Sequence, residues 1–378
     1  MELRDDGQDV FCQDSEYRVY KLSKCEFMIA SIDRSLTFVQ PKGFHLSDGA
    51  VYNYLQGNEY EDISVAWDWN LIPGITIDNT ATSLACGTTQ QTGVERFVGG
   101  VSDGDIGAAT MRYTNPLTKS LRWQKVWFFL DDDVQLVMVS GISSTTSAPV
   151  YTVLDQKRLS GSVMVNGAAS GPIQGATNVK TLWHNNVGYA FPPANGAFSL
   201  TTQSGQKTGS WSAIGTSTQP PATVNLFAAW IQHTSLTTPI FYTAFPGTTN
   251  DEFMQKSQAA NLQTVQNDQH ISAVYDANNN VAMIVFWDAK PGSVTIKPDS
   301  PAAPITVTAS GNLAVIYKLE SGEVTVSDPS QSSATAQVTL TLGSGENPPC
   351  WGSEKSQTLV FQLPSGGIAG KSVTQTVA

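Results

Sequence analysis

The 378-residue chain is long enough for two or three domains with well-buried cores. Only 14% of the residues are charged and the formal net charge is −11, so we expect the surface to repel nucleic acid, anionic membranes and most polyanionic glycans, and to suit neutral glycans better. No apolar run approaches the ~20 residues of a membrane-spanning helix.

The first distinctive segment, residues 52–69, is rich in aromatic and amide side chains. Trp and Tyr rings bind sugar rings by apolar stacking, while Asn, Asp and Gln side chains bind sugar hydroxyls. The alternative is that most of these rings belong to the core, and for Trp67 and Trp69 the sequence favours neither interpretation. The candidate glycan-binding residues are Tyr52, Asn53, Tyr54, Asn58, Tyr60, Trp67, Asp68 and Trp69.

Three carboxylates, Glu59, Glu61 and Asp62, crowd the same segment. Paired carboxylates at a suitable separation are what glycosidases use. We favour a solvated loop that positions the turn Trp67-Asp68-Trp69.

Two apolar runs, residues 125–130 and 134–139, flank three consecutive aspartates. The runs predict a hairpin, and because nearly every position is apolar, we expect both strands to be covered on both faces. Asp131, Asp132 and Asp133 are acidic enough for a metal site, but Asp readily closes turns through its own backbone contacts, so we predict a solvated turn.

Residues 251–267 are polar and lack β-branched runs, which predicts one short helix or a loop and a domain junction nearby. Further strands are predicted at 271–275 and 281–287, at 313–319 and 323–327, and, with one solvent-facing side, at 337–342 and 358–363. The whole pattern predicts an all-β protein with a first domain at residues 1–270 and a second at 271–378.

The cysteine count allows two disulfides in three connectivities, and no CxxC pair indicates zinc or redox chemistry. The cysteines are Cys12, Cys25, Cys86 and Cys350. We expect at least two buried thiols, and a Cys12–Cys25 bridge if the compartment is oxidising. The compartment itself is undetermined, although the charged residues 1–6 are unlike a secretory signal and no Asn-X-Ser/Thr sequon is present.

Metal and cofactor motifs are weak. Ser102-Asp103-Gly104-Asp105 lacks the acidic ladder of a calcium loop, and no two histidines stand at metal-ligand spacing. The histidines are His45, His184, His233 and His270. We predict structural or surface roles for them, and neither a metal nor a cofactor.

Four stretches carry a family resemblance through their shared order and spacing. They are Gly43-Phe44-His45-Leu46-Ser47-Asp48-Gly49 with the aromatic run to Trp69; Leu71-Ile72-Pro73-Gly74-Ile75-Thr76; Asp155-Gln156-Lys157-Arg158 with Trp183-His184-Asn185 and Gly188-Tyr189; and Ala229-Trp230-Ile231-Gln232-His233 with Tyr242 and Phe245-Pro246-Gly247. Together they resemble the β-rich C-terminal half of polysaccharide lyase family 8, the hyaluronate, chondroitin AC and xanthan lyases. The wording of the first two stretches is closest to fungal members. The resemblance implies a large antiparallel β super-sandwich followed by a smaller antiparallel β-sandwich.

Members of that family cleave uronate-containing chains by β-elimination, which needs a base and an acid at the uronate ring. The resemblance implies that these groups lie on an N-terminal helical toroid, which we expect this chain to lack, and that the β-half adds one supporting Glu from an Asn-[Gly/Ser]-Glu-Asn motif. Aligned without gaps back from Pro41, the motif falls on Thr37-Phe38-Val39-Gln40, so Val39 replaces the Glu. Because Val cannot pair with an Arg or orient a base, we expect a non-catalytic, lectin-like chain whose partner is carbohydrate.

Two rival hypotheses remain open. The chain could work as a lyase, alone or as one piece of a split enzyme, with His45, Tyr52, Tyr54 and Arg96 as the candidate groups. Alternatively, it could be a structural protein whose exposed sheet edge serves self-association into a homo-oligomer.

Overall fold

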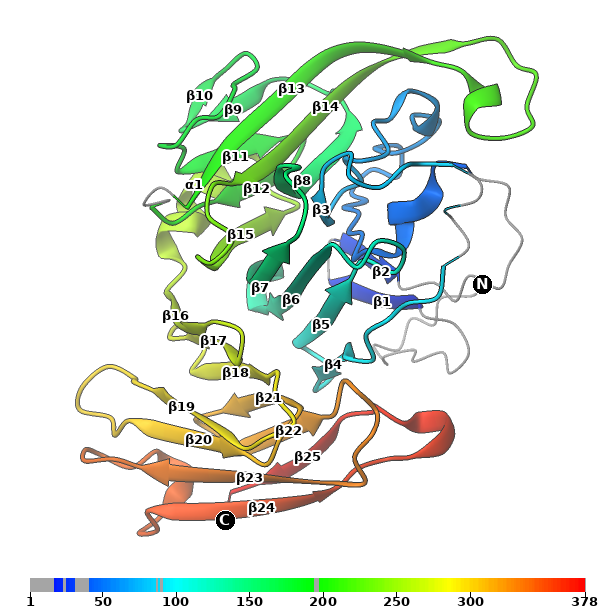
Figure 1. The fold of residues 1–378 in the computed structure, drawn as a ribbon. Coiled ribbons are helices and arrows are strands. Elements are labelled where there is room, and N and C mark those ends of the chain that lie inside the picture. Colours follow the sequence, from blue (N-terminus) through cyan, green and yellow to red (C-terminus); the bar gives the residue numbers. More distant parts are fainter. Residues whose placement is uncertain are drawn as a thin grey trace.

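The computed structural model describes residues 17–22 and 25–30 by their backbone, and residues 41–85, 88, 91–193 and 197–377 in full. Antiparallel strands dominate, and they form two sandwiches stacked one on the other (Figure 1). The predicted all-β class, a large super-sandwich followed by a smaller β-sandwich, is confirmed. In the described ranges, no helix is both long and apolar enough to cross a membrane.

The first sandwich pairs a nine-stranded sheet with a four-stranded sheet. The nine strands, in spatial order, are β10 (Ala168–Ala169), β9 (Val163–Val165), β11 (Thr181–His184), β12 (Val187–Ala190), β15 (Ile240–Pro246), β7 (Val134–Ser144), β6 (Leu121–Leu130), β5 (Gly107–Thr114) and β4 (Val98–Ser102). The four are β13 (Phe198–Gly209), β14 (Ala222–His233), β8 (Val150–Arg158) and β3 (Thr76–Asp78). A separate hairpin joins β1 (Tyr17–Leu22) to β2 (Cys25–Ala30).

The second sandwich pairs a six-stranded sheet with another four-stranded sheet. The six are β16 (Leu262–Asn267), β17 (Ile271–Asp276), β18 (Val281–Phe286), β21 (Leu313–Lys318), β22 (Glu323–Ser327) and β25 (Val373–Thr376). The four are β19 (Gly292–Ile296), β20 (Ile305–Ala309), β23 (Thr335–Leu342) and β24 (Ser356–Gln362). The predicted pairs β17–β18 and β21–β22 are confirmed, and β23 alternates buried with more exposed residues as expected.

The predicted hairpin of β6 and β7 lies at the centre of the stack. The two strands pair up to Leu130 and Val134, and the aspartates between them form the short 3-10 turn η4 (Asp131–Asp133), which confirms the predicted turn. The expected solvation is confirmed for Asp131 and Asp132 and is wrong for Asp133, which is buried. Trp127 on β6 belongs to the core of the first sandwich, while its neighbour Phe128 belongs to the core shared with the second. Successive side chains of a strand point to opposite faces. An apolar strand therefore fits here because a sheet covers each of its faces.

The two sandwiches share a continuous apolar interface. Val126 and Met138 of the nine-stranded sheet pack in one buried cluster with Met283 and Val285 of the six-stranded sheet. Gly99 on β4 comes so close to the second sandwich that an added Cβ would lie 2.5 Å from the Cα of Pro329. The relative placement of the sandwiches is therefore held by close packing as well as by the chain connection.

The polar segment before the second sandwich contains a helix and also a strand. Helix α1 (Asn250–Ala259) begins with a capping box between Thr249 and Glu252, and β16 follows it. The sequence did not predict β16, because its residues are only half-buried and it is held by backbone pairing to β17 at a sheet edge. The domain division at residues 270 and 271 stays a prediction, since β16 already belongs to the second sandwich.

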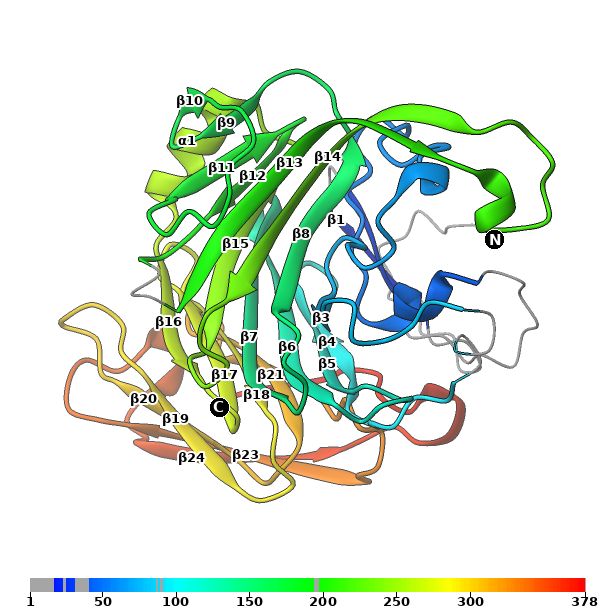
Figure 2. The ribbon, with the colours of Figure 1, turned by 45° about the horizontal axis from the view of Figure 1, so that its top comes forward.

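The segment from residue 41 to β3 covers the outer face of the first four-stranded sheet. It contains two 3-10 turns, η1 (Gly43–Ser47) and η2 (Ser64–Ala66), and buries Ile72 and Ile75 against Val153 and Trp230. Three more 3-10 turns are η5 (Trp211–Ala213), η6 (Pro349–Trp351) and η7 (Gly366–Ile368). Figure 2 shows β13 and β14 extending past the sheet to a tip that carries η5, on the side of this segment.

Candidate functional site

A buried carboxylate shapes the loop that follows the aromatic residues Tyr52 and Tyr54. Only 1% of Glu59 is exposed. Its Oε1 accepts hydrogen bonds from the backbone N–H groups of Leu55 and Gln56, at 2.9 and 2.7 Å, and its Oε2 accepts one from Gly57 at 3.0 Å. Three backbone donors on one carboxylate fix a tight loop.

The expected solvated loop is therefore wrong for Glu59 and confirmed for Glu61 and Asp62, which are both exposed. A hydrophilic composition does not reveal that one carboxylate of three turns inward. Glu59 turns inward because the backbone donors of the loop surround it.

The aromatic residues of the segment form one packed cluster. The ring of Tyr52 stacks on Trp67 with centroids 6.2 Å apart and planes 6° apart, and meets Tyr60 edge-on at 5.1 Å. Trp67 in turn meets Trp69 edge-on at 5.6 Å, and Tyr54 meets Tyr60 at 5.1 Å. Such offset and edge-to-face pairs are mutually stabilising, so the rings hold one another in place.

Burial divides the eight candidate glycan-binding residues into three groups. Tyr52, Asn53 and Trp69 are buried, Tyr60 and Trp67 are half-buried, and Tyr54, Asn58 and Asp68 are exposed. Partial burial, with the Glu59 carboxylate as a smaller cause, raises the pKa of the Tyr54 hydroxyl. Glycan binding by these residues stays a prediction, and the buried group is not accessible for it.

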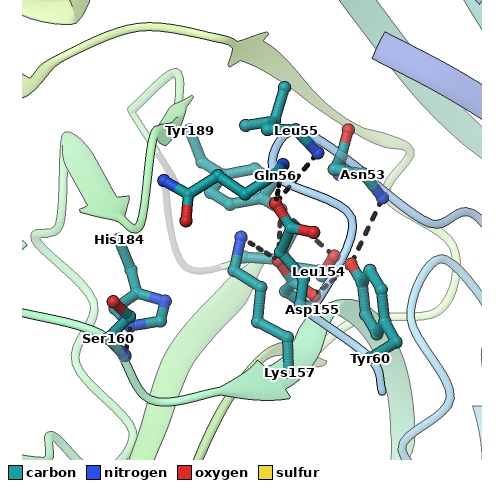
Figure 3. Close-up of polar contacts among 11 residues, drawn as sticks. Asn53, Leu55, Gln56, Tyr60, Leu154, Asp155, Lys157, Ser160, His184 and Tyr189 are labelled. Atoms are coloured by element: carbon teal, nitrogen blue, oxygen red, sulfur yellow. Dashed lines mark hydrogen bonds and ion pairs between the residues drawn. The ribbon is translucent and has the colours of Figure 1, made fainter.

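A polar cluster connects this segment to the interior of the first sandwich (Figure 3). The Lys157 ammonium lies 2.9 Å from Asp155 Oδ2, and both side chains are fully buried. The Tyr60 hydroxyl donates to Asp155 Oδ1 at 3.0 Å and accepts the backbone N–H of Asn53 at 3.2 Å. The Tyr189 hydroxyl, on the facing sheet, donates to Leu154 O at 3.3 Å.

The register of β8 explains how these groups enter the sandwich. Asp155 pairs with Ala229 and Val153 with Trp230, so Leu154 is an extra residue that bulges from the strand. A bulge changes the direction in which the following side chains point. Asp155 therefore reaches the first core, which contains Leu154, whereas Val153 points into the outer cluster.

The neighbouring residue Gln156 anchors the aromatic turn. Its Oε1 accepts the backbone N–H of Asp68 at 2.9 Å, and its Nε2 donates to the carbonyl oxygens of Asp68 and Leu71, both at 3.0 Å. The backbone of Gly74 lies close to that of Val51. Its φ is +86°, and an added Cβ would lie 2.6 Å from the Val51 backbone nitrogen, so this position requires a glycine. The motifs that are separate in the sequence are thus parts of one structural unit.

Three of the four histidines belong to the interior. His45 Nδ1 lies 2.7 Å from Asp48 Oδ2, and His233 Nε2 lies 2.8 Å from Thr152 Oγ1. The third, His184, has its Nε2 3.2 Å from the backbone nitrogen of Ser160. Burial, with a nearby Lys ammonium as the smaller cause, lowers the pKa of His184 and of His233 to about 3. The predicted structural role is therefore confirmed for these three side chains.

The accessible hollow of this region lies beside the aromatic cluster. It has a volume of about 510 Å³ and is lined by Asp62, Arg158 and Trp211, with Ser217 and Gln219 at the tip of the β13–β14 hairpin. Trp211 is half-buried and packs at the edge of the cluster that contains Tyr52 and Trp69. Arg158 Nη2 donates to Glu61 O at 2.5 Å, which holds the guanidinium at the rim.

The hairpin reaches this position because of a glycine. The backbone of Gly209 passes so close to η2 that an added Cβ would lie 1.7 Å from Val65 O. Trp211 follows two residues later and lines the cavity together with Asp62 and Arg158. An indole, a guanidinium, a carboxylate and an amide around one hollow can stack on a sugar ring and bind its hydroxyls.

Several expectations concern residues outside the description. The Val39 replacement, Cys12 and Cys86 all lie outside the described residues, and so does the side chain of Cys25. Cys350 is a free, half-buried thiol. In the ranges that the structure describes in full, no three His, Cys, Asp or Glu side chains are placed to hold a metal ion.

Family models match most of the chain. The model of the polysaccharide lyase family 8 super-sandwich domain matches residues 34–257, and that of the family's C-terminal β-sandwich domain matches residues 263–337. The chain belongs to polysaccharide lyase family 8. The four stretches singled out in the sequence lie within the matched residues 34–257, and the structure gives them packing roles around the bulge, the aromatic cluster and the cavity.

Curated relatives of this family 8 chain are bacterial lyases. It is 31% identical over 314 residues to chondroitinase-AC from Pedobacter heparinus, which covers 79% of this chain and 42% of the relative. It is 27% identical over 360 residues to xanthan lyase from Bacillus sp. (strain GL1), covering 88% of this chain and 37% of the relative. The chain therefore spans less than half the length of these relatives.

A solved structure of chondroitinase AC lyase with oligosaccharides has the same fold, with a TM-score of 0.80 at 24% identity over 96% of this chain and 53% of that one. Paenibacillus xanthan lyase gives 0.79 at 22% identity, over 96% and 37%.

Sequence reasoning did not single out Arg158 and Trp211 as residues that line this cavity. Trp211 stands alone in "GSWSAIGTST", a Gly-, Ser- and Thr-rich turn between two strands, and a single large aromatic residue in such a turn is a usable signal. Its neighbours in space, Asp62 and Arg158, are distant in the sequence, so no motif could connect the three.

Proposed function

We propose that this family 8 chain binds carbohydrate in the manner of a lectin, at the cavity of Asp62, Arg158 and Trp211, and that it carries out no elimination reaction by itself. The observation that carries the proposal is the grouping of an indole, a guanidinium and a carboxylate around one accessible hollow of about 510 Å³. Sites with an apolar platform and a few polar groups are typical of small-molecule and sugar binding.

The adjoining surface supports a ligand longer than one sugar. Tyr54, Asn58 and Asp68 are the exposed members of the aromatic segment, and that segment and Trp211 pack around the same apolar cluster. A glycan chain that leaves the cavity would therefore meet further aromatic and amide groups.

The charge of the site indicates the class of glycan. Arg158 and Asp62 balance one another at the cavity, and the chain carries a net charge of −11. The net negative charge of the chain would repel a heavily sulfated polymer at long range, and within the cavity the polymer would meet only one cationic side chain, Arg158. We therefore propose a neutral or sparsely charged glycan as the ligand.

The environment of the candidate acid–base groups supports the non-catalytic part of the proposal. His45 is buried and bonded to Asp48, Tyr52 is buried in the aromatic cluster, and burial raises the pKa of the Tyr52 hydroxyl far above its usual value. Neither side chain can reach a polymer in this conformation. Tyr54 and Arg96 are exposed, and the Glu59 carboxylate that acts on the Tyr54 hydroxyl is already bonded to three backbone N–H groups.

Isothermal titration of the purified chain with neutral and acidic oligosaccharides tests the binding. Trp211→Ala should weaken binding by about tenfold or more, because it removes the stacking platform. Thr218→Ala, at an exposed position between the lining residues Ser217 and Gln219, is the matched control and should bind as the unchanged chain does. No binding of any glycan at millimolar concentration, or equal affinity of Trp211→Ala, would refute the proposal.

A working lyase is the second candidate, favoured by the 31% identity to chondroitinase-AC. Incubation with chondroitin, hyaluronan and xanthan, followed by ultraviolet absorbance of the unsaturated product, tests it. We expect no product from this chain alone. Product formation would overturn the non-catalytic half of the proposal and leave the binding result to be judged separately.

A further inference from the structure

A second polar site lies at the junction of the two sandwiches, away from the aromatic segment. In the register of β5 and β6, Arg112 stands opposite Gln124 and Thr114 stands opposite Arg122. Residues two apart on a strand share a face, and diagonal neighbours are within reach of long side chains. These four side chains therefore form a polar block at the end of the sheet face that otherwise packs, through apolar residues, on the second sandwich.

Loops of the second sandwich stand against this block and enclose a cavity. It has a volume of about 380 Å³, and its lining includes Arg112, Arg122 and Glu95 from the first sandwich and His270 and Asp288 from the second. His270 and Asp288 flank β17 and β18, and His270 Nδ1 lies 2.6 Å from Asp288 Oδ2.

A glycine makes room for the cavity. Gly141 on β7 has a φ of +60°, and an added Cβ would lie 3.0 Å from the Gln124 side-chain amide. The pairing of β6 with β7 also shifts register between Arg122 and Gln124. The irregular end of the strand thus leaves space for the cavity beside the polar block. Continuous pairing and larger side chains would fill that space.

The acidic groups of the cavity already have partners. Asp288 is paired with His270, and Glu95 Oε1 accepts the Thr114 hydroxyl at 2.6 Å. Neither carboxylate forms an ion pair with Arg112 or Arg122 in the fully described ranges.

The cationic groups keep unused donors. Arg112 Nη2 donates to Trp287 O at 2.5 Å and to the Gln124 amide oxygen at 3.2 Å, which leaves its Nη1 and Nε without acceptors among the described residues. Arg122 is exposed, and its guanidinium has no hydrogen bond or ion pair with any residue in that part of the chain. Guanidinium groups present a planar fork of donors that matches the oxygens of carboxylate, sulfate and phosphate.

We propose that this cavity binds an oxyanion group, held by Arg122 and Arg112 with protonated His270 as an additional cation. The shared chemistry of the ligand is a sulfate, phosphate or carboxylate, whether free or attached to a sugar. Because the lining comes from both sandwiches, a bound oxyanion stabilises their association as well.

The proposed site is sensitive to pH through His270. The groups that face it are Asp288 and Asp268 on its own side and Glu95, Arg112 and Arg122 across the cavity. When His270 is neutral, the three carboxylates Asp288, Asp268 and Glu95 exceed the two guanidinium groups by one charge, and protonation of His270 offsets that negative charge. Oxyanion affinity therefore rises as the pH falls through the pKa of His270, which the hydrogen bond to Asp288 raises.

Titration with sodium sulfate, sodium phosphate and sodium glucuronate, against sodium chloride at equal ionic strength, tests the proposal by calorimetry and by the midpoint of thermal unfolding. We expect at least one of the three to bind and to raise the midpoint above that in chloride, and the tightest of them identifies the source of the oxyanion. Arg122→Gln, at an exposed partnerless position, should keep the fold and weaken binding by about tenfold or more.

Two matched variants make the test specific. Lys290→Gln removes an exposed positive charge two residues from Asp288, outside the cavity, and should bind as the unchanged chain does. His270→Gln should abolish the difference in sulfate affinity between about pH 5 and pH 8, a range in which sulfate, unlike phosphate, keeps a constant charge. Absence of any oxyanion effect beyond chloride, or equal losses in Arg122→Gln and Lys290→Gln, would overturn the proposal. Trp211→Ala should leave oxyanion binding unchanged, so this site and the carbohydrate site are judged independently.

Discussion

Gly209 offers a sharp test of how the carbohydrate cavity is built. In Gly209→Ala the new Cβ would lie 1.7 Å from Val65 O, 2.6 Å from Val65 C and 3.0 Å from Ala66 Cα. All three are backbone atoms, so no side-chain rotation relieves the clash. To bring the first contact to the 3.0 Å that real Cβ atoms tolerate, the hairpin must retreat from η2 by more than about 1 Å.

The retreat should affect stability and binding by different amounts. Overpacking of this kind costs about 1–3 kcal/mol of the free energy of unfolding. Trp211 lies two residues further along and moves with the hairpin, so a sugar ring loses the aligned platform, which is worth about 0.5–1.5 kcal/mol or roughly two- to twelvefold in affinity.

Gly215→Ala is the matched control for this perturbation. Gly215 lies in the same connection between β13 and β14, has no positive φ, and its added Cβ would meet only Trp211 O at 4.0 Å. Urea unfolding and glycan titration of both variants provide the measurements. If Gly209→Ala matched the control in unfolding and in affinity, the inference that close backbone approach positions Trp211 would be refuted.

Three further predictions concern the stability of the fold. Gly99→Ala should lower the free energy of unfolding in urea by about 1–3 kcal/mol, because the new Cβ would meet the backbone of Pro329 in the other sandwich. The control Gly93→Ala should change it little, because its Cβ would meet nothing within 4 Å. Equal effects of the two substitutions would contradict the close packing of the sandwiches. His233 has a pKa of about 3 in the fold, mainly through burial, so the unfolded chain binds a proton that the folded chain does not, and stability falls as the pH drops from about 6.5 to 3. His233→Gln should reduce that slope by up to about 1.4 kcal/mol per pH unit, and an unchanged slope in acid titrations monitored by fluorescence would count against the assignment. Burial lowers the pKa of Lys125 well below its usual value, so the free energy of unfolding rises with pH up to about 10.4. Lys125→Met should therefore raise stability at neutral pH by about 1 kcal/mol or more, and this gain should shrink as the pH rises. A pH-independent difference, or a loss of stability, would show that the ammonium is accommodated without penalty.

Much of the fold could be predicted because alternation in a strand is a local property. The apolar run of β6 indicated a strand covered on both faces, and it lies between two sheets. Residues 313–319 and 323–327 indicated the pair β21–β22 in the same way. The polar strand β16 escaped prediction because its hydrogen bonds to β17, rather than its side chains, hold it in the sheet.

The candidate site was less predictable, because burial and approach depend on partners elsewhere in the chain. Glu59 and Asp62 stand in one short stretch, yet one is 1% exposed and bonded to the backbone while the other lines an open cavity. Nothing in the local composition separates them. What separates them is the path of the loop.

By itself, the sequence determined that this is an all-β chain with the order and spacing of family 8 motifs, since strand alternation and turn residues act over a few neighbours. Only the tertiary structure decided which polar groups are accessible and which are grouped. Trp211 and Asp62 line one cavity because Gly209 allows the backbone of the hairpin to approach that of η2 closely. Arg122 and His270 line another cavity because the two sandwiches pack together. Such groupings of side chains depend on the packing of segments that are far apart in the chain, and a local sequence pattern does not predict that packing.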